Sequence, residues 1–292
     1  MSRLGLNVPA GWWPVAPLAK SFEAAGFVWA QVHAPPPGVL RDRDGRARHA
    51  GALRAALDTC GLRLVLHAPD DLPVGTPDAD RALDGLLDYA EAARAEIVVH
   101  HGANLVMADG GRAAARTRER ALREEDAIAA RARRLEEAGL TLALENLAPV
   151  WPGDPQRLAH NPGYVRELVR RLGSPRIGMC FDVGHARIAA DLVGGDVASM
   201  LAPVVDAVVI FHLHDNLGAR LSGGATPPVD PLRLDLHLPP GAGRVCWNEV
   251  AGVLRAHDAP LMLEVHPPHR PEPVTLASLT EGLLASGAVA AA

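Results

Sequence analysis

The 292-residue chain is predicted to fold as an α/β protein, a single (β/α)8 barrel of the TIM type covering residues 1–292. Three observations predict this. Eight short apolar runs rich in Val, Ile and Leu recur, most of them separated by segments with helical periodicity. Dividing 292 residues among eight units gives about 36 residues each, which suits a barrel of this size. The segment after the first run lacks the glycine-rich turn that opens a doubly wound nucleotide-binding sheet.

The strands are expected where apolar runs have the length of a strand that is buried on both faces. In chain order these runs are Leu4–Val8, Val28–His33, Leu62–His67, Ile97–His100, Leu140–Glu145, Ile177–Asp182, Ala207–His212 and Pro260–Glu264. The amphipathic segments expected as helices are Ala16–Ala25, Ala50–Cys60, Asp78–Ala95, Ala113–Ala138, Tyr164–Leu172 and Ser278–Leu284. Glycines that follow helical segments are expected to cap them: Gly26, Gly61, Gly139 and Gly173. Residues 216–246, rich in Gly and Pro, are expected to form a long functional loop, and residues 287–292 a frayed tail.

The composition excludes several classes of protein. A net charge of −5 argues against a general nucleic-acid or membrane coating. Lys20 is the one lysine, which excludes a P-loop and leaves little scope for Schiff-base chemistry. The three cysteines form no CxxC pair, which suits a reducing compartment. The N-terminal segment resembles no signal peptide, and the longest apolar stretch is too short to cross a bilayer. We therefore expect a cytoplasmic protein.

The third to eighth strands share one feature: each ends in a histidine or a carboxylate after apolar residues. These strand ends are His67, His100, Glu145, Asp182, His212 and Glu264. The carboxyl ends of barrel strands meet at one mouth, where barrel enzymes hold their chemistry. Burying these groups together without a counter-charge is costly, and carboxylate oxygen with imidazole nitrogen suits Zn, Mn, Fe or Co. The alternative is a set of capped or ion-paired strand ends without metal, and the matched positions favour the metal interpretation.

Two further segments extend this set. His185 follows Asp182 by three residues in the segment Asp-Val-Gly-His. In the long loop, Asp235 and His237 are two residues apart, so in an extended segment their side chains face one way and can share a metal. His101 has the opposite parity to His100 and is expected to pack against the fold or to face solvent.

The segments LALEN, CFDVGHA, FHLHDN, DLHLPPGAG and LMLEVH resemble those of the xylose isomerase-like barrel superfamily. That superfamily contains sugar phosphate isomerases and epimerases, and also the endonuclease IV group (AP endonuclease family 2). The resemblance implies one to three divalent metal ions per chain, most simply Zn or Mn, with Fe or Co as further candidates. One ion would be held by His67, His100 and Glu145. A second would be held by Glu145, Asp182, His212 and Glu264, and a third by His185, Asp235 and His237.

The first functional hypothesis is a metal-dependent sugar or sugar-phosphate isomerase or epimerase acting on a small polyol or keto-sugar. Glu145 and Glu264 would exchange a proton with the carbon beside a metal-polarised carbonyl, through an enediolate. Candidate substrate-binding residues lie in loops at the predicted mouth, and Arg187 and Arg220 could hold a phosphate or carboxylate. The full set of these candidates is Arg187, Arg220, His266 and Trp13.

The second hypothesis is an endonuclease IV-like phosphodiesterase that cuts abasic-site DNA or another phosphate ester. The complete set of nine ligands favours it, because clustered metals suit phosphate chemistry. An aromatic content of 4% and the near absence of lysine disfavour DNA-gripping loops. A third hypothesis is a non-catalytic sugar-binding barrel. No membrane partner is expected under any of the three, and the oligomeric state stays open.

Overall fold

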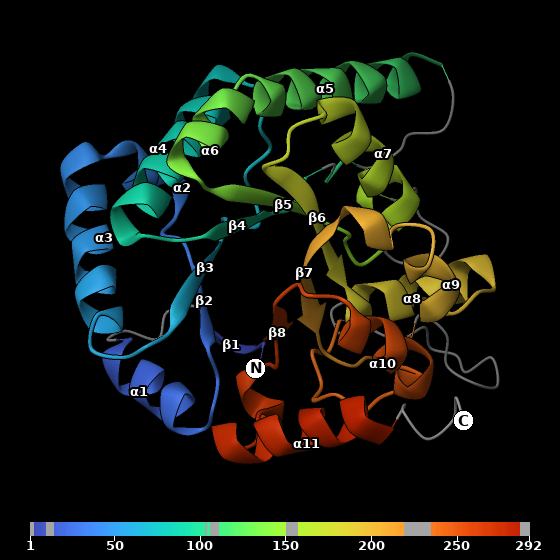
Figure 1. Cartoon of the computed structure of the whole chain (residues 1–292). Helices are drawn as coiled ribbons and strands as arrows, with labels where there is room; N and C mark the ends of the chain where they lie inside the picture. The colour runs from blue at the N-terminus through green and yellow to red at the C-terminus, as the bar shows by residue number, and fades with distance from the viewer. Residues whose placement is uncertain are drawn as a thin grey trace.

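A computed structural model describes residues 3–9, 15–102, 104–105, 111–149, 157–218 and 235–286. Its strands are parallel and close into a barrel in sequence order, with β8 pairing back onto β1. The strands are β1 (Leu4–Val8), β2 (Trp29–His33), β3 (Arg63–His67), β4 (Ile97–His100), β5 (Thr141–Glu145), β6 (Ile177–Asp182), β7 (Val208–Leu213) and β8 (Leu261–Leu263). Helices surround this barrel on its outside (Figure 1). The predicted (β/α)8 TIM barrel is confirmed, and each strand lies within two residues of its expected bounds.

The interior of the barrel is filled by side chains that recur at every second strand position. On β4, for example, Ile97 and Val99 face the interior, whereas Val98 between them packs towards the helices. The buried cluster inside the barrel consists of Trp29, Val65, Ile97, Val99, Ala143, Cys180, Ile210 and Met262. A separate and larger apolar cluster fills the space between strands and helices. This alternation decides which residues beyond the strand ends point into the mouth.

The helices that cover the barrel begin and end largely as their sequences dictate. Prolines open α4 and α7 at positions where the backbone N–H has no partner, and Thr76 and Asn161 cap these two helices. Gly139 and Gly173 end α6 and α7 in the left-handed conformation, with φ of 68° and 63°. The helices are α1 (Ala16–Ala24), α2 (Pro37–Arg41), α3 (Arg43–Leu57), α4 (Pro77–Ala93), α5 (Gly111–Ala129), α6 (Ala132–Ala138), α7 (Pro162–Leu172), α8 (Val183–Val193), α9 (Val197–Leu201), α10 (Trp247–Ala256) and α11 (Pro273–Ser286).

Several expectations about the helices need correction. The segment expected as one helix over Ala113–Ala138 forms two helices, α5 and α6, which are separated by residues 130 and 131. Gly61 caps no helix, since α3 already ends at Leu57. Helix α8 escaped the sequence analysis because it starts directly at the end of β6, with Asp182 serving both as the last strand residue and as the helix N-cap. Of the expected long loop, residues 219–234 lie outside the described residues, as does the expected tail at 287–292.

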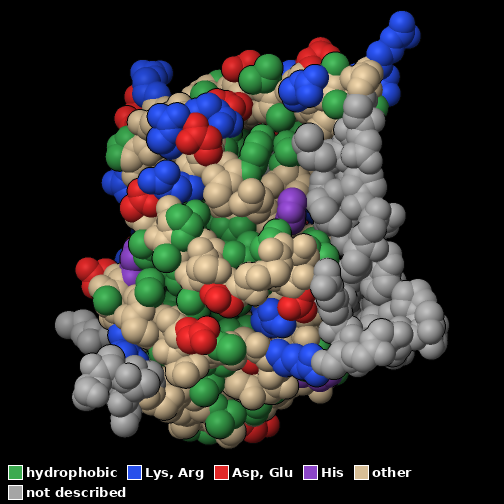
Figure 2. Space-filling model, turned by 90° about the vertical axis from the view of Figure 1, so that its right-hand side faces the viewer, with side chains coloured by type: hydrophobic (Ala, Val, Ile, Leu, Met, Phe, Trp, Pro, Cys, Tyr) green, Lys and Arg blue, Asp and Glu red, His purple; other side chains and the backbone are tan. Residues whose placement is uncertain are grey.

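Charges of both signs are mixed on the surface. In the face that Figure 2 shows, Lys and Arg side chains lie among Asp and Glu side chains and form no patch of a single sign. Arg131 pairs with Asp84 at 2.9 Å, and Arg171 pairs with Glu125 at the same distance. Among the described residues, no helix is both long enough and apolar enough to cross a membrane.

Candidate metal centre

Polar side chains gather at the carboxyl-terminal mouth of the barrel, where the inward-facing alternation of the strands ends. Ala143 faces the interior of β5, so Glu145, two residues further, faces the same way. The same spacing joins Met262 to Glu264 at the end of β8. The predicted strand-end groups that the structure brings together in this way are His67, Glu145, Asp182, His212 and Glu264. Each of them is at most 5% exposed.

The central cluster at the mouth consists of Glu145, Asp182, His212 and Glu264. One possible ligand atom from each of the four lies within 4.8 Å of the others. Nδ1 of His212 is 3.2 Å from Oε1 of Glu145, 3.4 Å from Oε2 of Glu264 and 3.7 Å from Oδ2 of Asp182. Three carboxylates therefore surround one imidazole nitrogen, as the strand ends predicted.

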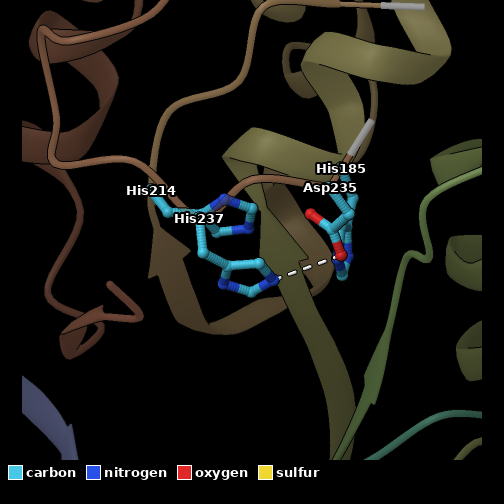
Figure 3. Close-up of side chains that lie close together, drawn as sticks. All are labelled: His185, His214, Asp235 and His237. Atoms are coloured by element: carbon cyan, nitrogen blue, oxygen red, sulfur yellow. Dashed lines mark hydrogen bonds and ion pairs between the residues drawn. The ribbon is translucent and has the colours of Figure 1, made fainter. Parts of the chain in front are cut away.

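A second cluster combines the start of α8 with the long loop (Figure 3). Nε2 of His185 and Nε2 of His237 each lie 3.2 Å from Oδ2 of Asp235. Both imidazoles donate Nδ1–H to a backbone carbonyl, His185 to Asn146 and His237 to Glu264, at 2.9 Å each. These bonds leave Nε2 of each ring facing Asp235, and metal-binding histidines are usually oriented by such a hydrogen bond of the other ring nitrogen. The structure thus brings the predicted third set together.

His214 joins this second cluster, although it is not among the ligands expected from the sequence. Its ring stacks on that of His237 with centroids 3.7 Å apart, and its Nε2 lies 3.0 Å from the Asp182 carboxylate. Figure 3 shows the two stacked rings on one side and Asp235 on the other. His214 therefore connects the second cluster to the central one. Its alternation with His212 along one segment is the signal that could have revealed it.

The close fit of His214 against α8 predicts a strong effect for Gly184→Ala. A Cβ at position 184 would lie 2.1 Å from Cε1 of His214, so the ring or the helix start would have to move. We expect the variant to lose about 1–3 kcal/mol of unfolding free energy, measured by denaturant titration. Gly252→Ala on α10, where a Cβ meets nothing within 4 Å, is the control and should not be destabilised. Equal stability of the two variants would contradict the assigned packing.

A third cluster corrects the assignment on β4. The structure brings His101 together with His67 and Glu145, and Nε2 of His101 lies 3.5 Å from Oε2 of Glu145. His101 continues the inward alternation of Ile97 and Val99, so its expected outward orientation is wrong. His100 instead faces away from the mouth and is buried, and neither of its ring nitrogens has a hydrogen-bond partner. Burial and the neighbouring imidazoles lower the pKa of His100 to about 3.

This correction predicts opposite outcomes for two neighbouring substitutions. His101→Gln is expected to weaken binding of a divalent ion at the His67 position by more than about 10-fold, because it removes a nitrogen that faces the mouth. His100→Leu is expected to leave metal binding unchanged and to maintain or raise stability, since it removes unpartnered buried nitrogens. Chelator competition and thermal melting measure the two effects. Loss of metal in His100→Leu with retention in His101→Gln would restore the assignment made from sequence.

Asp215 holds the loop that carries Asp235 and His237 in place. Its carboxylate accepts hydrogen bonds from the backbone N–H groups of Gly241 and Val245 at 3.0 Å each, and from Nε1 of Trp247 at 2.8 Å. A backbone bridge also pairs Asp215 with Leu238. The positions of Asp235 and His237 therefore depend on the buried carboxylate of Asp215, which holds the backbone of their loop.

The electrostatics of the central cluster balance carboxylates against imidazoles. Burial disfavours the charged form of His67, but its hydrogen bond with Glu145 and the charge of that residue raise its pKa to about 9. Burial likewise opposes ionisation of Glu264, yet the positive charge of His212 lowers the pKa of Glu264 to about 2. Glu145 follows the same pattern, with its pKa well below the ordinary value. Without a cation, protonated imidazoles supply the counter-charge.

The second cluster behaves in the same way. Burial opposes ionisation of Asp235, but the charges of His237 and His185 hold its pKa well below the ordinary value. In return, the Asp235 carboxylate overcomes burial and raises the pKa of His237 to about 9. The charges of Asp182 and Asp235 together overcome burial and raise the pKa of His185 well above its usual range. Each imidazole must therefore give up a proton before its Nε2 can bind a metal ion.

The residues present fit a divalent metal ion. Among the described residues, the ion-pair partners of Glu145, Asp182 and Glu264 are all histidines, whose positive charge is lost when they give up a proton. Carboxylate oxygens and imidazole nitrogens form a donor set typical of Zn, Mn, Fe or Co sites. The thiol of Cys180 lies at the edge of the cluster, beside Glu145 and His212. Burial raises the pKa of the Cys180 thiol far above its usual value, which keeps it protonated.

A cavity of about 440 Å³ opens above the clusters, within the size range of small-molecule sites. Glu145, Asp235 and Glu264 lie in its wall, and the predicted substrate residue His266 lines it as well. Arg187 does not line it, because its guanidinium pairs with Asp191 at 2.7 Å. The other predicted substrate residues, Arg220 and Trp13, lie outside the described residues.

The cavity wall also contains Asn7 and His33, which are not among the site residues expected from the sequence. Burial, together with the nearby His67, lowers the pKa of His33 to about 4. Burial and the nearby His237 likewise lower the pKa of His266 to about 4. Both imidazoles are therefore neutral near pH 7 and can donate and accept hydrogen bonds with a hydroxylated ligand.

Comparison with known proteins agrees with this architecture. Solved structures with the same fold include a D-tagatose 3-epimerase-like protein, with a TM-score of 0.69 and 19% identity over 100% of both chains. An L-ribulose 3-epimerase matches with a TM-score of 0.69 and 15% identity over 100% of this chain and 97% of the other. A 3-keto-D-glucoside 4-epimerase from E. coli matches with a TM-score of 0.67 and 13% identity over 97% and 99%. No curated protein matches the chain. The family model described as xylose isomerase-like TIM barrel matches residues 19–281, and the chain belongs to this family.

Proposed function

We propose that the protein is a metal-dependent epimerase or isomerase of a small keto-sugar. The observation that carries this proposal is the burial of Glu145 and Glu264 in one four-residue cluster at the floor of a 440 Å³ cavity. Similarity of fold to an L-ribulose 3-epimerase, a 3-keto-D-glucoside 4-epimerase and a D-tagatose 3-epimerase-like protein supports it. The proposed ligands of the central ion are Glu145, Asp182, His212 and Glu264.

The two glutamates are placed to move protons. They extend from β5 and β8, which are three strands apart around the barrel, and both line the cavity. A divalent ion would polarise the carbonyl of a bound sugar and acidify the neighbouring carbon. One carboxylate then removes the proton from that carbon, and the other returns a proton to its opposite face. His33 and His266 in the cavity wall would bind hydroxyl groups of the sugar.

The reaction can be tested by solvent exchange. Metal-loaded protein is incubated in D2O with a panel of ketopentoses and ketohexoses, and the products are examined by NMR. We expect deuterium at the carbon beside the carbonyl of at least one sugar, together with its epimer or isomer. Chelator-treated protein is the control and should show neither. Absence of exchange from the whole panel, with metal bound, would contradict the proposal.

A phosphodiesterase of the endonuclease IV kind is the second candidate. The observation that favours it is that Glu145, which belongs to the central and third clusters, lines the same cavity as His185 and His237 of the second cluster. Several neighbouring ions would suit hydrolysis of a phosphate ester. Incubation of the metal-loaded protein with a fluorescent abasic-site duplex separates the two functions. Strand scission at an enzyme-like rate, without exchange into any sugar, would establish this second candidate.

A further inference from the structure

A buried amide beneath the central cluster belongs to none of the three hypotheses drawn from the sequence. Gln31 lies on β2, two residues beyond the inward-facing Trp29, and therefore points into the barrel. Its side chain is fully buried. It hydrogen-bonds Glu264 through Nε2, and its Oε1 lies 2.9 Å from Nε2 of His212. Gln31 thus contacts two of the four residues of the central cluster, from across the barrel.

The chemistry of these partners leaves one arrangement of protons. An ionised carboxylate only accepts hydrogen bonds, so the amide NH2 of Gln31 must face Glu264. The amide oxygen then faces His212, and Nε2 of His212 must carry the proton that it accepts. In the metal-free protein Nδ1 of His212 is protonated as well and donates to Oε1 of Glu145. Because Nε2 stays committed to Gln31, a divalent ion would displace the proton on Nδ1, which is the atom surrounded by Glu145, Asp182 and Glu264.

The hydrogen bond from Gln31 also places the two carboxylate oxygens of Glu264 in different surroundings. Oε1 is held by Gln31, whereas Oε2 lies 3.4 Å from Nδ1 of His212 and faces the cluster. We propose that Gln31 is a positioning residue, which selects the Nδ1-binding tautomer of His212 and presents one oxygen of Glu264 to the metal ion. This role rests on the proposed metal position. Groups that orient metal ligands in this way typically contribute about 10–100-fold to metal affinity or activity.

Gln31→Met tests the proposal, because methionine keeps the length of the side chain but can form neither hydrogen bond. We expect the affinity for Zn or Mn, measured by chelator competition, to fall about 10–100-fold. We expect the metal-free variant to melt below the temperature of the wild type, because Oε1 of Glu264 and Nε2 of His212 lose the hydrogen bonds that Gln31 makes with them. Metal affinity is therefore measured at a temperature at which both proteins are folded. Wild-type affinity in Gln31→Met would overturn the proposal.

Val32→Ala is the matched control. Val32 is the next residue of β2, is equally buried, and faces the helices instead of the mouth. The Val32→Ala variant should melt at a lower temperature than the wild type while binding the metal ion with unchanged affinity. A fall in affinity equal to that of Gln31→Met would show that any damage to β2 disturbs the site, and would refute a specific role for Gln31.

A measurement on the wild type makes the test independent of whether the variants fold. In zinc-loaded protein labelled with ¹⁵N, NMR should show a protonated Nε2 and a metal-bound Nδ1 for His212, identified by loss of the signals in His212→Asn. Binding through Nε2 would overturn the proposal while leaving the proposed function intact. A wild-type protein that binds no divalent ion would overturn both.

Discussion

Glu264→Gln is expected to abolish interconversion of the two epimers, with the rate falling about 10²–10⁴-fold at saturating metal. The amide has nearly the shape of the carboxylate, so the surrounding packing is retained. It cannot take up or release a proton near pH 7, whereas the low pKa of Glu264, about 2, makes the native carboxylate available as a base. The rate is measured with the sugar identified by solvent exchange.

Asp182→Asn provides the control that separates proton transfer from metal binding. Asp182 belongs to the same buried cluster but does not line the cavity, so it should affect the reaction through the ion and not as a proton carrier. Excess metal should therefore restore much of the activity of Asp182→Asn and little of that of Glu264→Gln. If excess metal restores both variants equally, Glu264 is a ligand without a role in proton transfer.

A rise in pH is expected to weaken the metal-free protein and to strengthen metal binding. The pKa values of His67 and His237 are raised to about 9 by Glu145 and Asp235. A raised histidine pKa stabilises the fold below the unfolded value of about 6.5, and this stabilisation is lost as the pH rises through about 9. Metal binding displaces the same protons, so its affinity should increase roughly 10-fold per pH unit for each proton released.

Thermal melting between pH 6 and 9, with chelator and with saturating Zn or Mn, measures both effects. The two curves should diverge as the pH rises, with the metal-free protein falling and the loaded protein keeping its melting temperature. His237→Asn removes one of the protons that metal binding displaces. The slope of the logarithm of metal affinity against pH should therefore fall by about one unit. Parallel curves in the wild type would show that these imidazoles do not exchange protons for metal.

Local patterns in the sequence predicted most of the barrel and most of the candidate site. Each strand is buried on both faces, so a short Val- and Ile-rich run is a clear signal by itself. A polar residue at the end of such a run, as at Glu145 or His212, marks the mouth, because the strand carries it there in a known direction. Helix α8 left no comparable signal, since Asp182 ends the strand and caps the helix with no turn between them.

The error on β4 shows where a local pattern is insufficient. Both His100 and His101 follow the same apolar run, and the sequence alone does not say at which of them the inward alternation continues. The packing of Ile97 and Val99 inside the barrel decides it in favour of His101. A shift of one residue along a strand reverses which face a side chain occupies, so closure of the barrel had to select the register.

By itself, the sequence determined that eight alternating units would build a barrel and that acidic and imidazole groups would line its rim. Only the tertiary structure decided which of these groups meet. Gln31 and Glu264 are 233 residues apart, and His214 stacks on a ring from the following loop. Such contacts depend on how strands that are distant in the sequence come to lie near one another when the barrel closes. Alternation along a single strand determines the direction of a side chain and carries no information about its partner on another strand.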